Sequence, residues 1–244
     1  SKNESGLELT LLKGKVNILI LAEDLVRVRF TQYDAFEKDF SYAIAKSDWL
    51  TKFDIIEETD FIYLVTKKLK VKIQKNPFRI TFLDLENNII SEDEKSFGIS
   101  YAGTEVQTYK TLDKTEKFFG LGEKVGDLNK KGKAFKMWNT DFFAYGNMQD
   151  PLYVSIPFFI GMRNNNAYGY FLDNSSETFF NLGASQERYY SFGAKNGELN
   201  YYFFYGPEVS KVVERYTDLT GKSYMPPIWA LGYQQCRWSN YTDT

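Results

Sequence analysis

Hydrophobic and polar residues alternate strictly along much of the first hundred positions. In one such segment Val26, Val28 and Phe30 share one side, while Arg27 and Arg29 share the other. Successive side chains of a strand point to opposite faces of a sheet, so this alternation indicates a strand with one buried face.

A second alternating stretch predicts an antiparallel meander. Residues 69–74 alternate apolar side chains with lysine and glutamine, and the pattern restarts at Phe78 after the turn residues Asn76-Pro77. A third apolar run begins at Ile89, behind Asn87-Asn88. Asparagine tolerates the left-handed backbone that tight hairpin turns require, so we expect three neighbouring strands here.

The second half of the chain predicts a loop followed by further strands. Between Phe118 and Tyr153, glycine and polar residues break the periodicity, which indicates a long loop region able to present functional groups. Short aromatic-rich runs then follow at about ten-residue spacing, as is typical of a β-sandwich. These runs are residues 153–159, 167–172, 187–192 and 199–204.

One segment near the end has helical periodicity. Pro207 suits a first helical turn and Gly221 a C-terminal stop. The apolar residues expected on one helical face are Val209, Val212, Val213, Tyr216 and Leu219. The predicted organisation is an antiparallel β-sandwich domain at 1–206, a helix and linker at 207–227, and a strand opening a further domain at 228–244.

Composition narrows the chemistry. The 244 residues include 21 Phe and 18 Tyr, which favours an all-β fold, but no His and a single Cys, Cys236. Serine or cysteine triads with histidine and Cys/His metal sites are therefore excluded, and acid-base chemistry is left to carboxylates. We expect no cofactor and no metal.

Charge and hydropathy exclude two classes of partner. The formal net charge is -2, with both signs interleaved along the chain, which argues against nucleic acid. No apolar run approaches the roughly 20 residues of a membrane span, and residues 1–5 lack the features of a signal peptide. We expect a soluble protein; the compartment stays open.

A glycine-rich motif invites a nucleotide-binding interpretation. Residues 120–126 read Gly-Leu-Gly-Glu-Lys-Val-Gly, with the spacing G-x-G-x-x-x-G. A pyrophosphate-binding motif has the spacing G-x-G-x-x-G and lies in a strand–turn–helix unit. This segment has a different spacing and a β-rich context, so we interpret it as a turn.

Residues 138–141, Trp-Asn-Thr-Asp, combine a flat apolar ring with a carboxylate inside the predicted loop. Sugars stack their C–H faces on aromatic rings while a carboxylate accepts hydrogen bonds from their hydroxyls, so Trp138 and Asp141 are candidate sugar ligands. The alternative is an aromatic-anchored loop in which Asp141 caps a turn. Arg237 and Trp238 are similarly ambiguous: they fit a buried strand end with a structural arginine, and only a neighbouring active site would make them functional.

Read in order, eight segments resemble the N-terminal region of glycoside hydrolase family 31, the α-glucosidases and α-xylosidases. The resemblance is collinear from about residue 69 onward, whereas residues 1–68 are similar only in strand pattern. The segments are 69–82, 119–123 (Phe-Gly-Leu-Gly-Glu), 138–141, 153–158, 169–175, 202–207, 216–221 and 226–238.

This resemblance implies a galactose-mutarotase-like β-sandwich packed against a (β/α)8 barrel whose first strand would span about 228–236. It also implies a retaining α-glycosidase whose two catalytic Asp residues lie on later barrel strands; nothing in this chain matches either motif. Asp141 would contact the sugar on the leaving-group side. Trp238 would wall the sugar pocket, with Arg237 positioning it.

Two other functions stay open. A stand-alone carbohydrate-binding sandwich would use Trp138 and Asp141 without catalysis, although it would not need the barrel-like segment 227–238. A structural β domain that mediates subunit contacts is compatible with the first interpretation. The fragment itself is predicted to be inactive alone, because the catalytic pair is missing.

Overall fold

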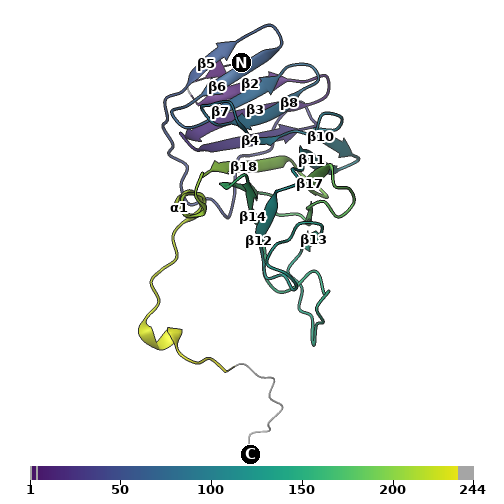
Figure 1. Cartoon of the computed structure of the whole chain (residues 1–244), viewed down its shortest axis with the longest axis vertical. Coiled ribbons are helices and arrows are strands. Elements are labelled where there is room, and N and C mark those ends of the chain that lie inside the picture. Colours follow the sequence, from purple (N-terminus) through teal and green to yellow (C-terminus); the bar gives the residue numbers. More distant parts are fainter. Residues whose placement is uncertain (1, 4, 236–244) are drawn as a thin grey trace, which may run out of the picture.

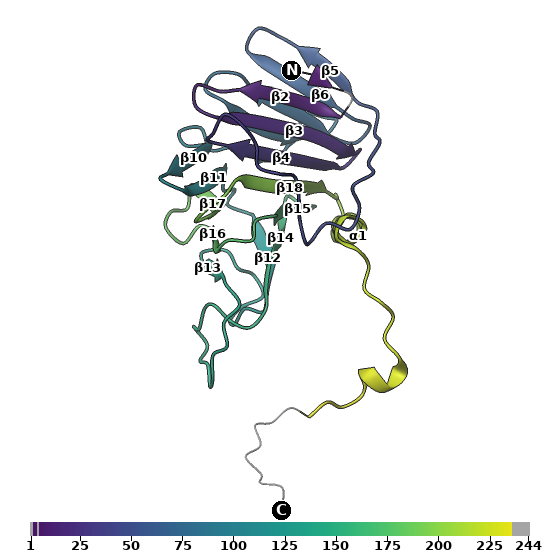
Figure 2. The same ribbon diagram turned by 180° about the vertical axis from the view of Figure 1, so that it is seen from behind.

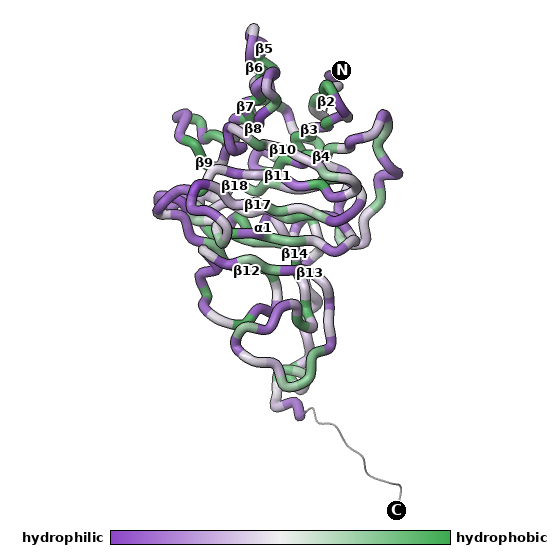
Figure 3. Tube along the Cα trace, turned by 90° about the vertical axis from the view of Figure 1, so that its right-hand side faces the viewer, coloured by the Kyte–Doolittle hydropathy of each residue, from purple (hydrophilic) through white to green (hydrophobic). Residues whose placement is uncertain are grey.

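The computed structural model describes residues 2–3 and 5–235, and within them three antiparallel sheets form (Figure 1). The prediction of an all-β sandwich is therefore confirmed for this part of the chain. Strands such as β14 are mainly hydrophobic, while many connecting loops are hydrophilic (Figure 3).

The largest sheet has eight strands and combines strands from the N-terminal and C-terminal parts of the chain. Its central pair brings β4 against β18, with Phe30 opposite Leu199 and Leu25 opposite Phe204. In spatial order the strands are β1 (Lys2–Asn3), β2 (Gly6–Thr10), β3 (Lys15–Ala22), β4 (Leu25–Thr31), β18 (Leu199–Tyr205), β15 (Asn166–Leu172), β14 (Ser155–Arg163) and β12 (Lys117–Gly122).

The three strands of the predicted meander are confirmed, and they belong to a five-stranded sheet with two further strands before them. Its turn residue Asn87 has a φ of 68°, the left-handed conformation expected before the last strand. The strands, in both chain and spatial order, are β5 (Asp54–Glu57), β6 (Phe61–Val65), β7 (Lys70–Gln74), β8 (Arg79–Leu83) and β9 (Ile89–Glu92).

A third sheet continues beyond the meander, to which it is joined by a bridge between Asp93 and Lys110. Its order is β10 (Ile99–Ala102), β11 (Glu105–Thr111), β17 (Tyr189–Ala194), β16 (Thr178–Asn181) and β13 (Ala134–Met137).

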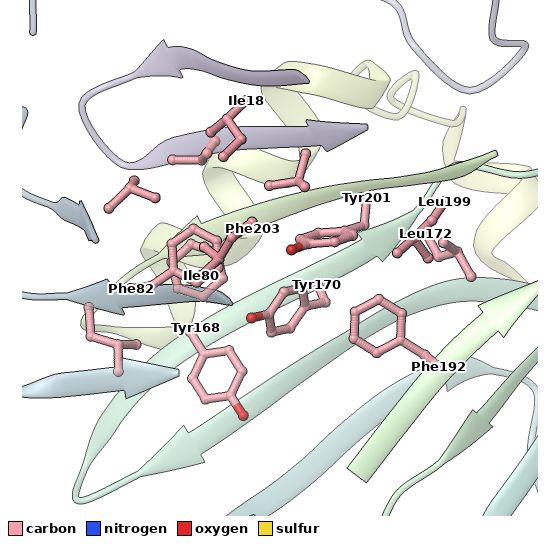
Figure 4. Close-up of a cluster of buried hydrophobic side chains, with 14 of the residues drawn as sticks. Ile18, Ile80, Phe82, Tyr168, Tyr170, Leu172, Phe192, Leu199, Tyr201 and Phe203 are labelled. Carbon is pink, nitrogen blue, oxygen red and sulfur yellow. The ribbon is translucent and has the colours of Figure 1, made fainter. Parts of the chain in front are cut away.

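The main core lies between the eight-stranded sheet and both smaller sheets. Alternate residues of β15 and β18 enter it, including the fully buried Tyr170, Tyr201 and Phe203 (Figure 4). The ring of Phe203 stacks on Phe82 of the meander at 3.8 Å between centroids. Aromatic side chains wide enough to span two pleated layers explain the unusual phenylalanine and tyrosine content.

Part of the opposite face of the large sheet is covered by α1 (Val209–Thr220), which lies beside β15 and β18 (Figure 2). Val212 and Leu219 are buried there, and Tyr216 stacks on Phe158 at 4.0 Å. The predicted apolar face is thus only partly right, because Val209 and Val213 are each 41% exposed. No helix in the described ranges has the length and apolar character needed to cross a bilayer.

Two strands contradict the predicted loop between Phe118 and Tyr153. Residues 117–122 form β12 at one edge of the large sheet, and residues 134–137 form β13. Their alternation was hidden because β12 contains Gly120 and Gly122, and because β13 is only four residues long. β16, at 178–181, was missed for the same reason of length.

The predicted barrel strand at 228–236 is not confirmed. Residues Ile228–Leu231 form a 3₁₀ helix, and residues 232–235 are not part of a strand. A barrel strand needs hydrogen-bonded neighbours on both sides, and the described residues supply none to this segment. Its apolar side chains, Ile228, Trp229, Leu231 and Tyr233, are correspondingly exposed.

Candidate functional site: an exposed aromatic arm

Residues 138–154, which we call the arm, connect β13 to β14 and project beyond the sheets (Figure 1). The arm gathers exposed apolar side chains that contribute little to the core. Contiguous exposed aromatic surface is typical of binding sites. The exposed members are Trp138, Phe142, Phe143, Tyr145, Met148, Tyr153 and Val154.

Both predicted ligands in this region lie at the start of the arm. Trp138 is 54% exposed, and Asp141 follows it as an exposed residue. Capping of a turn by Asp141 would require a hydrogen bond to its carboxylate, and no such bond is present in the described part of the chain. The Asp141 carboxylate is therefore available to an incoming ligand.

The other two predicted ligands, Arg237 and Trp238, lie outside the described residues, as does Cys236. The prediction that they join the sugar site stays a prediction.

Hydrogen bonds close the neck of the arm. The backbone N–H of Thr140 donates to the carbonyl of Leu152 at 2.9 Å, and that of Ser155 donates to the Asn139 side-chain oxygen at 2.8 Å. Leu152 is buried. Asn139 therefore has a structural role, although it lies between the two predicted ligands. The sequence motif alone does not distinguish this structural role from ligand binding.

The glycine-rich turn at residues 120–122 packs against the neck of the arm. Gly120, Leu121 and Gly122 have φ values of 117°, 73° and 76°, and the register of β12 against β14 shifts between the two glycines. A Cβ at Gly122 would lie 2.6 Å from the Val154 carbonyl oxygen, so only glycine fits. The next backbone N–H, of Glu123, donates to that same carbonyl at 2.9 Å.

A separate cavity of about 450 Å³ lies between residues 37–43 and the outer face of the large sheet. Its polar groups bind one another. Both terminal nitrogens of Arg27 donate to Asp39, at 2.7 and 2.8 Å, and its Nε donates to Asn200 at 2.9 Å. The hydrogen bond from Arg27 lowers the pKa of Asp39. This mutual satisfaction favours a fold-supporting role.

The most perturbed carboxyl group is remote from the arm. Glu116 precedes β12, at the opposite end of that strand from Gly122, and is buried. Burial raises its pKa to about 7, although the hydrogen bond from the Tyr168 hydroxyl opposes the rise. A core position makes Glu116 inaccessible to a sugar. Among residues 2–3 and 5–235, no group of three or more histidine, cysteine or acidic side chains is arranged to hold a metal ion.

The sequence is similar to that of known glycoside hydrolases. Residues 15–181 match the family model described as the glycosyl hydrolase 31 N-terminal galactose mutarotase-like domain. The chain is 38% identical over 232 residues to alpha-glucosidase 2 of Bacillus thermoamyloliquefaciens, and 39% identical over 168 residues to an alpha-glucosidase of Saccharolobus solfataricus. These alignments cover 94% and 68% of this chain, but 29% and 24% of the respective relatives.

A solved structure with the same fold is a family 31 dextranase of Flavobacterium johnsoniae, in a complex with isomaltotriose. It superposes with a TM-score of 0.88 and 33% identity, over 96% of this chain and 29% of the dextranase. The present chain therefore spans less than a third of the length of these relatives.

Proposed function

The chain belongs to glycoside hydrolase family 31, and from that premise we propose that it is the N-terminal domain of a retaining α-glycosidase of α-glucosidase type. In this proposal the β-sandwich supports a catalytic (β/α)8 barrel, and the arm reaches toward the substrate entrance. The described residues do not themselves form a (β/α)8 barrel.

The observation that carries the proposal is the pairing of Trp138 with Asp141 at the exposed start of the arm. The indole ring offers a flat surface to the C–H face of a sugar, and the unpaired carboxylate can accept hydrogen bonds from two hydroxyls. We place this contact on the leaving-group side of the scissile bond. Trp238 and Arg237 would complete the sugar pocket.

The bond cleavage itself requires two carboxylates that this chain does not supply. In a retaining mechanism they lie about 5 to 5.5 Å apart; one attacks the anomeric carbon while the other protonates the leaving oxygen. Such residues lie at the C-terminal ends of barrel strands. The arm would bind and orient the leaving sugar, and the barrel would perform the chemistry.

Turnover of aryl glycosides tests this division of labour. We expect release of p-nitrophenol from an aryl α-glucoside or α-xyloside by the polypeptide extended through its full reading frame, and none by residues 1–244 alone. The preferred sugar would identify the substrate class. Activity in residues 1–244 alone would contradict the assignment of catalysis to the missing barrel.

Replacing Asp141 tests the arm. In the extended enzyme, Asp141→Ala should lower kcat/KM for isomaltotriose by about tenfold, since hydrogen bonds to a charged group contribute about 1.5–3 kcal/mol. Hydrolysis of α-glucosyl fluoride should change little, because its leaving group is a single atom. Asp127→Asn, on an exposed neighbouring loop, is the matched control. Unchanged isomaltotriose kinetics would remove Asp141 from the site.

A second candidate function, a carbohydrate-binding sandwich without catalysis, is favoured by the exposure of the arm in this chain. Calorimetric titration of isomaltotriose into residues 1–244 distinguishes the two. Binding that is lost in Trp138→Ala, together with an inactive extended polypeptide, would support the binding module. Absence of binding together with an active extended polypeptide would support the glycosidase.

A further inference from the structure

A partly buried ion pair joins the arm to the scaffold. Lys124, two residues beyond the end of β12, places its Nζ 2.5 Å from Oδ1 of Asp150, on the returning limb of the arm. The side chain of Lys124 is 1% exposed and that of Asp150 is 21% exposed. A pair so shielded is screened little by salt, so it restrains geometry more firmly than a surface pair does.

The same two side chains also engage β13, from which the arm departs. Oδ2 of Asp150 accepts a hydrogen bond from the backbone N–H of Lys136 at 2.5 Å, and Nζ of Lys124 donates to the Lys136 carbonyl at 2.7 Å. One carboxylate and one ammonium therefore tie together the end of β12, the strand β13 and the returning limb. Trp138 begins two residues beyond this junction.

The glycine-rich turn aims Lys124 at this junction. A bulge bends its strand and redirects the side chains that follow, and here the register shift between Gly120 and Gly122 immediately precedes Lys124. Leu121 keeps a left-handed φ of 73°, which is costly for a branched side chain, and is held there by complete burial. Backbone strain of this kind, maintained beside an exposed arm, indicates that the direction in which the chain leaves β12 is important for placing Lys124.

Beyond the junction the outer part of the arm is held lightly. Within it the Gln149 backbone N–H donates to the Gly146 carbonyl at 3.1 Å, and the Tyr145 ring lies 6.0 Å from that of Tyr153. The Tyr153 hydroxyl donates to the Phe142 carbonyl. These contacts are internal to the arm. The position of its tip relative to the sheets therefore depends on its base.

We propose that the Lys124–Asp150 ion pair is the positioning contact that holds Asp141 at the substrate entrance. This inference rests on the proposed function, and it adds two positioning residues that do not themselves touch the sugar. An arm released at its base would still carry Trp138 and Asp141, but it would spend less time where both can engage a leaving sugar.

Hydrogen exchange on residues 1–244 tests the anchoring independently of any activity. Asp150→Asn replaces one carboxylate oxygen with an NH2 group, which cannot accept a hydrogen bond from Lys124 Nζ or from the Lys136 N–H. One of these two contacts is therefore lost, and the junction opens. We expect exchange of the hydrogen-bonded amides of Thr140 and Ser155, at the neck of the arm, to accelerate by about tenfold, while β15 and β18 stay protected. Lys124→Met is the second variant, used if Asp150→Asn does not fold.

Asp127→Asn is the matched control. It removes an ion pair to Lys133 of similar length, 2.8 Å, in the neighbouring loop, where the Asp127 side chain is 82% exposed. Exchange of the Thr140 and Ser155 amides should match that of the unchanged chain. Equal exchange in Asp150→Asn, Lys124→Met and the unchanged chain would overturn the anchoring.

Kinetics of the extended enzyme test the positioning. Asp150→Asn should raise KM for isomaltotriose by about tenfold, with kcat changed less, and should leave α-glucosyl fluoride hydrolysis within about twofold. In an Asp141→Ala background, Asp150→Asn should have a smaller effect than in the unchanged enzyme, because only the Trp138 contact remains to be mispositioned. A general loss of stability would instead lower activity toward both substrates, and would overturn the positioning role.

The two proposals fail in different ways. A large effect of Asp141→Ala with none of Asp150→Asn would leave the function of Asp141 intact and overturn the positioning contact. No effect of Asp141→Ala on isomaltotriose would refute the role of the arm in substrate binding, whereas faster exchange in Asp150→Asn would still support Lys124 and Asp150 as its anchor.

Discussion

The core beneath β15 and β18 and the arm are built from the same kinds of side chain. Each has several aromatic rings and one Lys–Asp ion pair. In the core, Lys110 Nζ lies 2.6 Å from Asp93, and both side chains are fully buried. In the arm the rings face solvent, Phe143 being 86% exposed, and the Lys124–Asp150 pair lies only at the base.

The difference shows that surroundings, not composition, decide whether such side chains pack in a core or stay exposed. The Lys110–Asp93 pair is completed by further partners, since Lys110 donates to the Tyr201 hydroxyl at 3.3 Å and Asp93 accepts from the Ile80 backbone N–H at 2.7 Å. Burial lowers the pKa of Lys110, and the carboxylate of Asp93 opposes this. The charged groups of this core pair are thus engaged by the fold, whereas the rings of the arm and Asp141 are exposed.

The largest expected effect comes from breaking the core ion pair. Asp93→Ala should lower the free energy of unfolding by about 4 to 5 kcal/mol, because it leaves the Lys110 ammonium buried and uncompensated. Urea denaturation measures this loss. Asp127→Asn, which removes an exposed pair, should cost less than about 1 kcal/mol. Similar losses in the two variants would contradict the contrast between buried and exposed pairs.

The same ring truncation in the two regions sharpens the comparison. Phe203→Ala removes a fully buried ring stacked on Phe82, and should cost about 3 to 4 kcal/mol by leaving a cavity. Phe143→Ala, in the arm, should change stability by less than about 0.5 kcal/mol. Denaturation midpoints of both variants check this. A strongly destabilised Phe143→Ala would mean that the arm packs in solution.

The pH dependence of stability should report on Glu116. The folded state holds its proton up to a pKa of about 7, above the ordinary 4.5 of the unfolded chain. Unfolding therefore releases a proton between these values, so stability should fall as pH rises from 4.5 to 7 and then level off. The total is about 3 kcal/mol, at 1.36 kcal/mol per pKa unit.

Glu116→Gln keeps a hydrogen-bonding group of the same shape toward Tyr168 and the Asp113 backbone N–H. It should remove this part of the pH dependence and be more stable than the unchanged chain at pH 8. Thermal unfolding from pH 4 to 8 measures both quantities. The remaining charged neighbours, Arg163 and Asp113, are common to both proteins, so an identical slope in the two would exclude Glu116 as its source.

The smallest effect concerns the hydroxyl groups in the core. Tyr190 bonds to the Tyr168 hydroxyl at 3.1 Å and to Ser91 Oγ at 3.2 Å. Tyr190→Phe should cost about 1 kcal/mol, the usual net value of a buried hydrogen bond. Tyr189→Phe, at the neighbouring half-buried position, is the control. Equal stabilities would show that the hydroxyl network adds nothing to ring packing.

Local pattern by itself determined much of this protein. The alternation around Val26 and Val28, the meander at residues 69–92, the left-handed turn at Asn87 and the helix ending at Gly221 were all predictable, because each depends on neighbours a few residues apart. The collinear motifs identified the family, and the segment from Trp138 to Asp141 identified the candidate site residues. Strands with glycine or only four residues, such as β12 and β13, escaped because too few positions remained to show a period.

Only the tertiary structure decided which distant segments meet. The pairing of β4 with β18, the burial of Lys110 beside Asp93 and the contact of Lys124 with Asp150 each join residues separated by 17 or more positions. A lysine or an aspartate reads the same in a sequence whether it is solvated or buried. Its partner is chosen by the packing of whole sheets, because the cost of desolvating a charge is set by what surrounds it in space.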